Sequence, residues 1–195
     1  MVLLFSFRSS VADWYYVPTG SMEPTIQVGD RVVVDKSAYT LELPFTDVVV
    51  AKTGNINRGD IVIIDSNAAE TRLIKRVVAI EGDKVKLENN VLFINGEKAT
   101  VSAKDHNLYS EEILGQTRTI ALNPLPSPAK NFNLVTVPRD HVLAMGDNRN
   151  NSVDSRYYGF IPIEEIQGKA NAVAFSLDTK NMYLPRKERF FTSLF

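Results

Sequence analysis

A serine in a tight turn near the N-terminus is the first candidate for chemistry. Ser21 lies in the segment 17–25, VPTGSMEPT, where Gly20 precedes it and prolines stand on both sides. Glycine allows a sharp turn and proline makes it rigid, so the serine hydroxyl is presented and nearby backbone N–H groups are left without partners. Such a turn suits a nucleophile. Taken alone, the segment is more simply explained as a surface turn rich in serine and threonine.

A lysine on an apolar strand face is the second candidate. The segment 72–80, RLIKRVVAI, predicts a strand on which Leu73, Lys75 and Val77 share one face. Burial there favours the neutral amine and lowers the lysine pKa from about 10.4 toward about 7 to 8, where the amine can act as a general base. A lysine at a strand edge whose ammonium reaches water is the simpler alternative for this segment by itself.

A polar stretch late in the chain is the third candidate. The segment 146–156, GDNRNNSVDSR, is too polar for a core and denser in hydrogen-bonding side chains than an ordinary linker. Asp154 and Arg156 are two residues apart, so on an extended backbone they lie on the same side and can pair with each other. The segment can therefore brace a site, although a solvated loop also explains it.

In this order and at these spacings, GSMEPT, RLIKRVVAIEGDKV and GDNRNNSVDSR resemble the bacterial type I signal peptidases. These are membrane proteases of family S26 that remove signal peptides by means of a Ser/Lys dyad, and the resemblance covers residues 17–158. It implies that Ser21 is the nucleophile and that Lys75 is the general base and later the general acid. The implied enzyme is a signal peptidase I, a serine endopeptidase.

The resemblance also assigns supporting residues. Ser152 matches the serine that hydrogen-bonds and orients the lysine. Thr19 stands where the family has a hydroxyl that joins the Ser21 N–H in the oxyanion hole. Asp154 and Arg156 match a structural ion pair. The candidates for the substrate pocket border the dyad in sequence and are Val17, Pro18, Met22 and Ile74. Asn150 departs from the family, where an Asp is common at this position.

The implied substrates are signal peptides of secreted preproteins, cut after small residues at positions −1 and −3. The implied location is the cytoplasmic membrane, with the catalytic domain on its periplasmic or extracellular face and in contact with the lipid surface. The implied chemistry needs no metal and no cofactor.

Composition excludes several other classes. The 195 residues include no cysteine and two histidines, which rules out iron–sulfur clusters, thiolate zinc sites, cysteine nucleophiles and disulfides. The 22 Lys and Arg residues against 23 Asp and Glu residues give a net charge of −1, which argues against a nucleic-acid partner.

The fold class is predicted to be mostly β. The chain has 21 Val and 13 Ile residues against 16 Leu, and long helical periodicity is hard to find. The resemblance implies antiparallel sheets with a small inserted β-ribbon domain. We therefore expect a catalytic β-domain over 17–82 and 134–180, an inserted ribbon and loop region over 83–133, and a tail over 181–195.

Local patterns refine this division. Residues 84–100 predict a meander with turns at Asn89-Asn90 and Asn95-Gly96. Residues 103–131, with Pro124, Pro126 and Pro128, predict a loop-rich excursion. One helical turn is expected at 163–166.

The first seven residues, MVLLFSF, are too few to cross a bilayer, since a spanning helix needs about 20. With the resemblance in view, residues 1–16 are expected to be the end of a membrane anchor and its lead-in. The sequence is then truncated, its start codon is misplaced, or the protein works from the membrane surface. Trp14, Tyr15 and Tyr16 suit a membrane interface, although aromatic clusters are more often simply packed.

Two other functions stay open. The first is a related Ser/Lys-dyad maturation peptidase with a different substrate; a self-cleaving repressor of this chemistry is disfavoured because only 20 residues precede Ser21. The second is a non-catalytic binding module on the same fold. The presence of Ser21, Lys75 and Ser152 together argues against the module, which has no use for a buried lysine beside a hydroxyl.

Overall fold

The structure is a computed structural model that describes residues 12–42, 49–124 and 128–194. The apolar segment at the start of the chain, with its predicted membrane anchor, lies outside the described residues. No helix within these three ranges is long and apolar enough to span a membrane.

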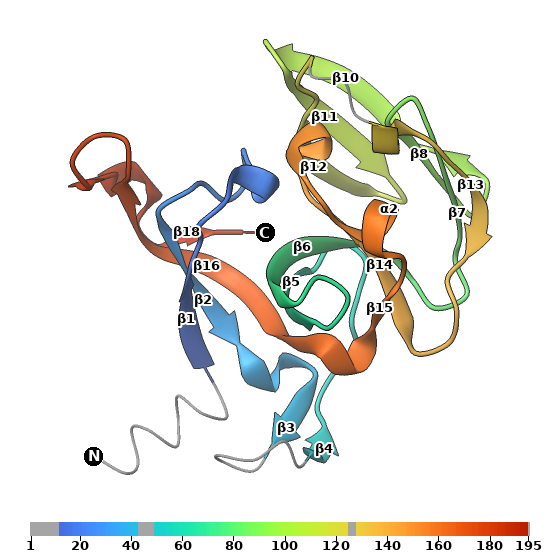
Figure 1. Ribbon diagram of the computed structural model, residues 1–195, viewed down its shortest axis with the longest axis horizontal. Coiled ribbons are helices and arrows are strands. Elements are labelled where there is room, and N and C mark those ends of the chain that lie inside the picture. The colour runs from blue at the N-terminus through green and yellow to red at the C-terminus, as the bar shows by residue number, and fades with distance from the viewer. Residues whose placement is uncertain (1–11, 43–48, 125–127, 195) are drawn as a thin grey trace.

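A large antiparallel sheet forms the centre of the molecule (Figure 1). Nine strands belong to it in the described part of the chain. Seven of them follow in space the order β1 (Ala12–Tyr16), β2 (Asp30–Asp35), β16 (Ile166–Asp178), β5 (Ile61–Ser66), β6 (Thr71–Ile80), β14 (His141–Met145) and β15 (Ile161–Pro162). Two short strands, β17 (Leu184–Pro185) and β18 (Thr192–Ser193), also pair with β16. The predicted lead-in and tail thus contribute strands to this sheet, and the division into domains stays a prediction.

Strand β5 shows why a continuous apolar run belongs in the middle of this sheet. Ile61 and Ile63 pack into the core on one face, together with the turn that carries Ser21. Val62 and Ile64 pack into a second core on the other face. A strand buried on both faces has no polar side to present, so its apolar residues need not alternate. This double burial makes β5 and its neighbour β6 a rigid support.

The predicted meander is confirmed. A four-stranded sheet contains β13 (Phe132–Thr136), β7 (Lys84–Glu88), β8 (Val91–Ile94) and β9 (Glu97–Lys98). The two turn pairs have positive φ at both central residues, Asn89 and Asn90 in one and Asn95 and Gly96 in the other. Asparagine and glycine tolerate this conformation best, so the turns follow directly from the sequence. A separate two-stranded sheet joins β3 (Thr40–Glu42) and β4 (Val49–Lys52).

The predicted loop-rich excursion is wrong over most of its length. Strands β10 (Thr100–Asp105), β11 (Leu108–Ile113) and β12 (Gln116–Ala121) form a regular three-stranded antiparallel sheet. The reason is that two of its buried positions carry charges. Glu111 and Arg118 face each other across β11 and β12, both buried and ion-paired. A search for apolar alternation cannot recognise strands of this kind.

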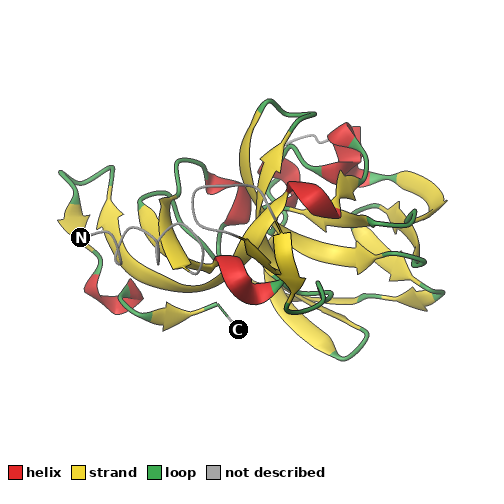
Figure 2. Ribbon diagram, turned by 90° about the horizontal axis from the view of Figure 1, so that it is seen from below, coloured by secondary structure: helices red, strands yellow, loops and turns green. Residues whose placement is uncertain are grey.

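Helices are short, and Figure 2 shows that strands make up most of the regular structure. The one α-helix of the described residues is α2 (Ser155–Tyr158). The single-turn 3-10 helices are η1 (Gly20–Met22), η2 (Lys36–Ala38), η3 (Pro128–Lys130), η4 (Arg149–Asn151), η5 (Ile163–Glu165) and η6 (Lys187–Arg189). Helix η5 confirms the expected helical turn, and the mostly β, antiparallel fold class is confirmed as a whole.

Candidate active site

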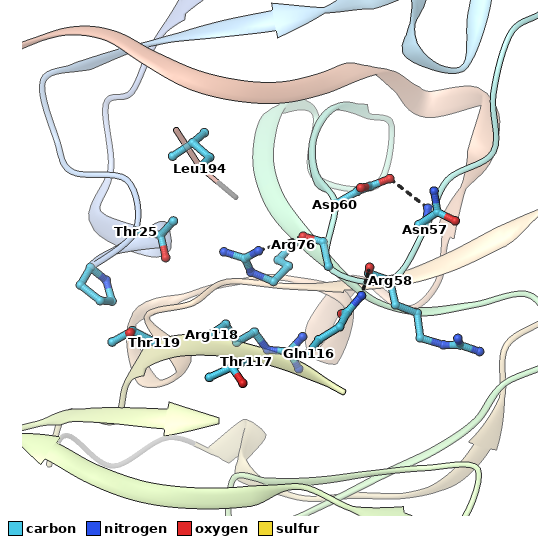
Figure 3. Close-up of a pocket in the computed structure, with 12 residues that line it drawn as sticks. Thr25, Asn57, Arg58, Asp60, Arg76, Gln116, Thr117, Arg118, Thr119 and Leu194 are labelled. Atoms are coloured by element: carbon cyan, nitrogen blue, oxygen red, sulfur yellow. Dashed lines mark hydrogen bonds between the residues drawn. The ribbon is translucent and has the colours of Figure 1, made fainter. Parts of the chain in front are cut away.

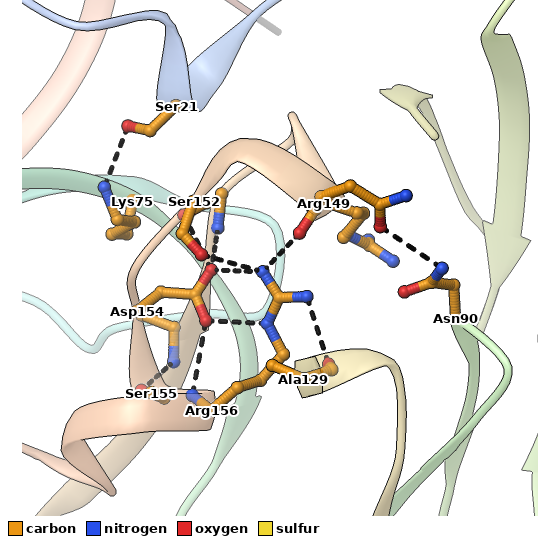
Figure 4. Close-up of polar contacts among 12 residues, drawn as sticks. Ser21, Lys75, Asn90, Ala129, Arg149, Ser152, Asp154, Ser155 and Arg156 are labelled. Atoms are coloured by element: carbon orange, nitrogen blue, oxygen red, sulfur yellow. Dashed lines mark hydrogen bonds and ion pairs between the residues drawn. The ribbon is translucent and has the colours of Figure 1, made fainter. Parts of the chain in front are cut away.

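Ser21 and Lys75 lie side by side, 54 positions apart in the sequence. Ser21 sits in η1, between β1 and β2, and Lys75 sits in the middle of β6. The Lys75 Nζ donates a hydrogen bond to Ser21 Oγ at 2.9 Å (Figure 4). A second bond from the same nitrogen reaches the Ile74 carbonyl at 3.0 Å and limits the rotation of the amine. The turn and the strand singled out by their residue types therefore meet.

The surroundings of Lys75 favour the neutral amine. The residue is only 4% exposed, and this burial lowers the pKa of its amine to about 8. Of the charges that act on it, Asp154 and Asp147 raise the pKa and Arg156 lowers it. Desolvation is the largest of these effects, and at a pKa of about 8 about a tenth of Lys75 is uncharged at pH 7. An uncharged amine within hydrogen-bonding distance of a hydroxyl can remove its proton.

Gly146 allows the last motif to approach the nucleophile. A Cβ built at this position would overlap both the Ser21 carbonyl oxygen and the Ser152 hydroxyl. Its φ is not in the left-handed region, so the need for glycine comes from close contact and not from backbone strain. The Gly146 N–H donates to Asp154 Oδ2 at 2.9 Å. One residue without a side chain thus brings together three parts of the site.

The acid and base of the last motif form an ion pair. The Asp154 carboxylate accepts hydrogen bonds from Arg156 Nε and Nη2, each at 2.8 Å. Burial works against the ionised carboxylate, but Arg156 and the other donors outweigh it and hold the pKa of Asp154 below its ordinary value. The Ser152 hydroxyl also donates to Asp154 Oδ2, at 2.7 Å. The Ser152 hydroxyl therefore donates its proton in a hydrogen bond to Asp154. The role of Ser152 in orienting Lys75 stays a prediction.

Three residues that sequence reasoning did not single out lie around the turn that carries Ser21. Asn148 donates from its backbone N–H to the Ser21 carbonyl and from Nδ2 to the Gly20 carbonyl, both at 3.0 Å. Arg76 binds the Asp147 carboxylate at 2.9 and 2.7 Å. The only sequence signal for these three residues was that Arg76 follows Lys75 and that Asp147 and Asn148 are the two residues after Gly146.

The remaining candidates differ in exposure. Thr19 is exposed, and its Oγ1 donates to Ser21 Oγ at 3.4 Å. Val17 and Met22 are buried in the core beneath the turn, where Ile74 packs against the same cluster. Pro18 is exposed. The role of this group in binding a substrate stays a prediction.

A polar cavity of about 710 Å³ lies next to the site without containing the dyad. Its lining includes Thr25, Asp60, Arg76, Gln116 and Arg118 (Figure 3). The charged members are engaged elsewhere, Arg76 with Asp147 and Asp60 with Lys169. Among the described residues there is no group of three side chains that could hold a metal ion.

Comparison with known proteins identifies the family. The model of the family described as signal peptidase, peptidase S26, matches residues 1–175. The chain belongs to this family. It is therefore a hydrolase of the signal peptidase I class, a membrane-associated group of peptidases that act on preproteins with signal peptides.

Two proteins of similar sequence agree with this assignment. The signal peptidase I of Pseudomonas aeruginosa is 33% identical over 213 residues, which cover 97% of this chain and 74% of that protein. The probable signal peptidase I-2 of Synechocystis is 32% identical over 176 residues, which cover 87% of this chain and 66% of that protein. A crystal structure of a signal peptidase I from Enterococcus faecalis V583 covers 59% of this chain and 96% of its own, with 26% identity and a TM-score of 0.40.

Proposed function

We propose that this protein cleaves signal peptides from exported preproteins after small residues at positions −1 and −3, with Ser21 and Lys75 as a catalytic dyad. The observation that carries the proposal is the 2.9 Å hydrogen bond between Lys75 Nζ and Ser21 Oγ. The test is incubation of the full chain, in detergent or lipid, with a precursor that carries an Ala-x-Ala site, followed by determination of the new N-terminus of the product.

The reaction is an acyl transfer through a covalent intermediate. Neutral Lys75 accepts the proton of the Ser21 hydroxyl while Oγ attacks the scissile carbonyl carbon. The resulting ammonium gives this proton to the leaving amine, which departs as the N-terminus of the mature protein. Lys75, neutral again, then removes a proton from water, and the hydroxide attacks the ester at Ser21. Protonation of Oγ by Lys75 releases the signal peptide and restores the dyad.

The negative oxygen of the tetrahedral intermediate needs donors. We assign this role to the Ser21 N–H and the Thr19 hydroxyl. The Ser21 N–H lies in the first turn of η1, where backbone N–H groups have no acceptor within the helix. The Thr19 hydroxyl already lies near Ser21 Oγ and can turn toward the new oxyanion. One such donor is typically worth about 2.7 to 4 kcal/mol in the transition state.

Ser152 is assigned the orientation of the lysine amine. Its hydroxyl proton is committed to Asp154, so the lone pairs of its oxygen are free to accept a hydrogen bond from Lys75 Nζ. Its position against Gly146, which also contacts the Ser21 carbonyl, supports this role. The Asp154–Arg156 pair keeps Ser152 in place.

We assign the preference for small residues to the apolar surface around the turn. Val17 and Met22 are buried and form the floor beneath Ser21, while Ile74 and Pro18 are more exposed and border it. A floor that is already packed leaves shallow pockets, because interiors of native density have little room for an added side chain. Small side chains fit such pockets and larger ones do not.

We propose that the protein acts at the cytoplasmic membrane, with the catalytic domain on the periplasmic or extracellular face and in contact with lipid. Large apolar side chains are exposed on β1 and in the segments that follow β16, which lie on the side of the molecule away from β10–β12 (Figure 1). They include Trp14, Tyr16, Met182, Tyr183 and Phe191. The tryptophan and the two tyrosines among them are residue types that favour the lipid–water interface. Nucleic acid is not an expected partner, given the net charge of −1.

The test also separates the alternatives. A maturation peptidase with a different substrate would leave the Ala-x-Ala precursor intact and yet depend on Ser21 for cleavage of another protein. A binding module would retain precursor without cutting any peptide bond.

A further inference from the structure

Three charged residues form a cluster in the interior that the catalytic reaction does not use. We call Glu111, Arg118 and Arg149 the Glu111 cluster. Arg149 donates from Nη1 and Nη2 to the two Glu111 oxygens at 2.6 Å each, and Arg118 Nε donates to Oε2 at 2.6 Å. Glu111 is completely buried, Arg149 is 1% exposed and Arg118 is 8% exposed. Burial opposes the ionisation of Glu111, but the guanidinium groups of Arg149 and Arg118 have the larger combined effect and lower the pKa of Glu111 to about 2.

The Glu111 cluster joins two separate parts of the chain. Glu111 and Arg118 belong to β11 and β12, in the three-stranded sheet. Arg149 belongs to η4, in the loop that continues to Ser152. A buried, bidentate ion pair is therefore one of the contacts between the three-stranded sheet and the loop that continues to Ser152. Another is the backbone hydrogen bond from the Ala121 N–H to the Asp147 carbonyl at 2.9 Å.

The interactions continue from Arg149 to the dyad (Figure 4). The Arg149 carbonyl accepts a hydrogen bond from Arg156 Nη2 at 2.7 Å. Arg156 holds Asp154, and Asp154 accepts from the Ser152 hydroxyl and from the Gly146 N–H. Gly146 in turn lies against the Ser21 carbonyl. Every step in this series is a short polar contact or a close packing contact.

Stability is not a sufficient reason for the Glu111 cluster. Desolvating charges costs several kcal/mol per ion, and apolar residues of similar volume often stabilise a fold equally well. Two of its buried nitrogen atoms, Arg118 Nη2 and Arg149 Nε, have no hydrogen-bond partner in the described part of the chain. What charged groups provide and apolar groups do not is a fixed orientation, because bidentate pairs tolerate little rotation.

We infer that Glu111 is a positioning residue for catalysis: it holds Arg149 so that the Arg149 carbonyl keeps Arg156 on Asp154, and thereby keeps Ser152 and Gly146 in place beside the dyad. This inference rests on the proposed function, because it concerns the same dyad. It gives the three-stranded sheet a part in the reaction, through the loop that carries Arg149.

Loss of the Glu111 charge has a predictable electrostatic effect. The other carboxylates that act on Arg149 are Asp147 and Asp154, which are also the two that raise the pKa of Lys75. Without the negative charge of Glu111, Arg149 competes with Arg76 and Arg156 for these two carboxylates. At present Arg76 binds Asp147 and Arg156 binds Asp154. Negative charge is drawn away from Lys75, so its pKa falls further and the acidic limb of the activity profile moves to lower pH.

The experiment compares Glu111→Gln with Asp83→Asn in the full chain. Asp83 is a matched control because it is buried and held by Arg58 in a bidentate pair at 2.7 and 2.5 Å. Its other side-chain partners are the Ile80 N–H, at the end of β6, and Asn95 Nδ2, and neither belongs to the series from Arg149 to Gly146. For Glu111→Gln we expect kcat to fall roughly tenfold or more, since small misplacements of catalytic groups are costly. We also expect an unchanged KM and an acidic limb at lower pH. For Asp83→Asn we expect a lower melting temperature with kcat and the limb unchanged.

If Glu111→Gln behaves like Asp83→Asn, losing only thermal stability, the inference is wrong. Should Glu111→Gln fail to fold, the triple variant Glu111→Leu, Arg118→Met, Arg149→Met replaces the cluster by apolar groups, and wild-type kcat in that folded variant overturns the inference. Failure of the proposed function is distinguishable, because the unmodified chain would then not cleave the precursor at all.

Discussion

The Lys75 amine reaches the Ser21 hydroxyl at 2.9 Å from inside a strand that is packed on both faces. A lysine in such a strand has few directions in which to extend, and its second bond to the Ile74 carbonyl narrows them further. The base is therefore positioned by a strand that is packed on both faces. The nucleophile is carried by η1, whose Gly20 and Ser21 carbonyls accept hydrogen bonds from Asn148.

Ser21→Ala and Lys75→Ala should each abolish cleavage of an Ala-x-Ala precursor, because the first removes the attacking oxygen and the second removes the base. Lys75→Arg should fail as well, since a guanidinium stays protonated and cannot accept a proton. Product formation is followed by gel electrophoresis and mass spectrometry. Lys84→Ala, which removes an exposed lysine on β7, is the control and should retain full activity. Full activity in either alanine variant of the dyad would refute its assignment.

The pH dependence of kcat/KM should show an acidic limb near pH 8. Lys75 acts as a base only when neutral, and burial lowers the pKa of its amine to about 8, so activity rises as the pH increases through that value. An ordinary lysine would give a limb near 10.4, about the value in model peptides. Initial rates at low substrate concentration, measured from pH 6 to 10.5, decide between these values. A limb close to that of free lysine would contradict the burial argument.

Lys75→Met should stabilise the fold at neutral pH. The folded pKa of about 8 lies below the unfolded value of about 10.4, so protonation of Lys75 weakens the folded state. This loss is complete below the folded pKa and disappears above the unfolded one; it amounts to about 3 kcal/mol, at 1.36 kcal/mol per pKa unit.

Denaturant titrations of the wild type and of Lys75→Met at pH 7 and pH 10.5 test this. The variant should gain stability at pH 7, and the gain should shrink at pH 10.5. Equal differences at the two pH values would mean that desolvation of the charge does not limit stability.

Gly146→Ala should impair both folding and activity. The added methyl group would overlap the Ser21 carbonyl and the Ser152 hydroxyl, and both belong to the site. Overpacking of this kind costs typically about 1 to 3 kcal/mol. Gly115→Ala is the comparison: it has open space for the methyl group, so its positive φ costs stability without disturbing the dyad. Thermal melts and cleavage rates should show lower stability in both variants and lost activity only in Gly146→Ala.

Sequence patterns predicted much of the fold, and the resemblance to the type I signal peptidases singled out the pair Ser21 and Lys75. Local conformational preferences account for the Asn-Gly and Asn-Asn turns, the strands of β-branched residues and the serine turn. Such preferences depend only on residues close in the sequence, so they can be recognised without the fold. The same patterns failed for residues 103–121, because the strand positions that should be apolar hold Glu111 and Arg118. Their burial is acceptable only when both are paired, and the second partner, Arg149, comes from a distant part of the chain.

The sequence by itself determined which groups are available for chemistry: a hydroxyl on a rigid turn, an amine on an apolar strand face, and neither cysteine nor more than two histidines. Only the tertiary structure decided that the hydroxyl and the amine meet, that the Ser152 hydroxyl donates to Asp154, and that the Glu111 cluster joins β11 and β12 to the loop that continues to Ser152. Residue type sets what a group can do in water, but its protonation state and its partner depend on burial and on contacts between distant segments. Those contacts exist only after the chain has folded.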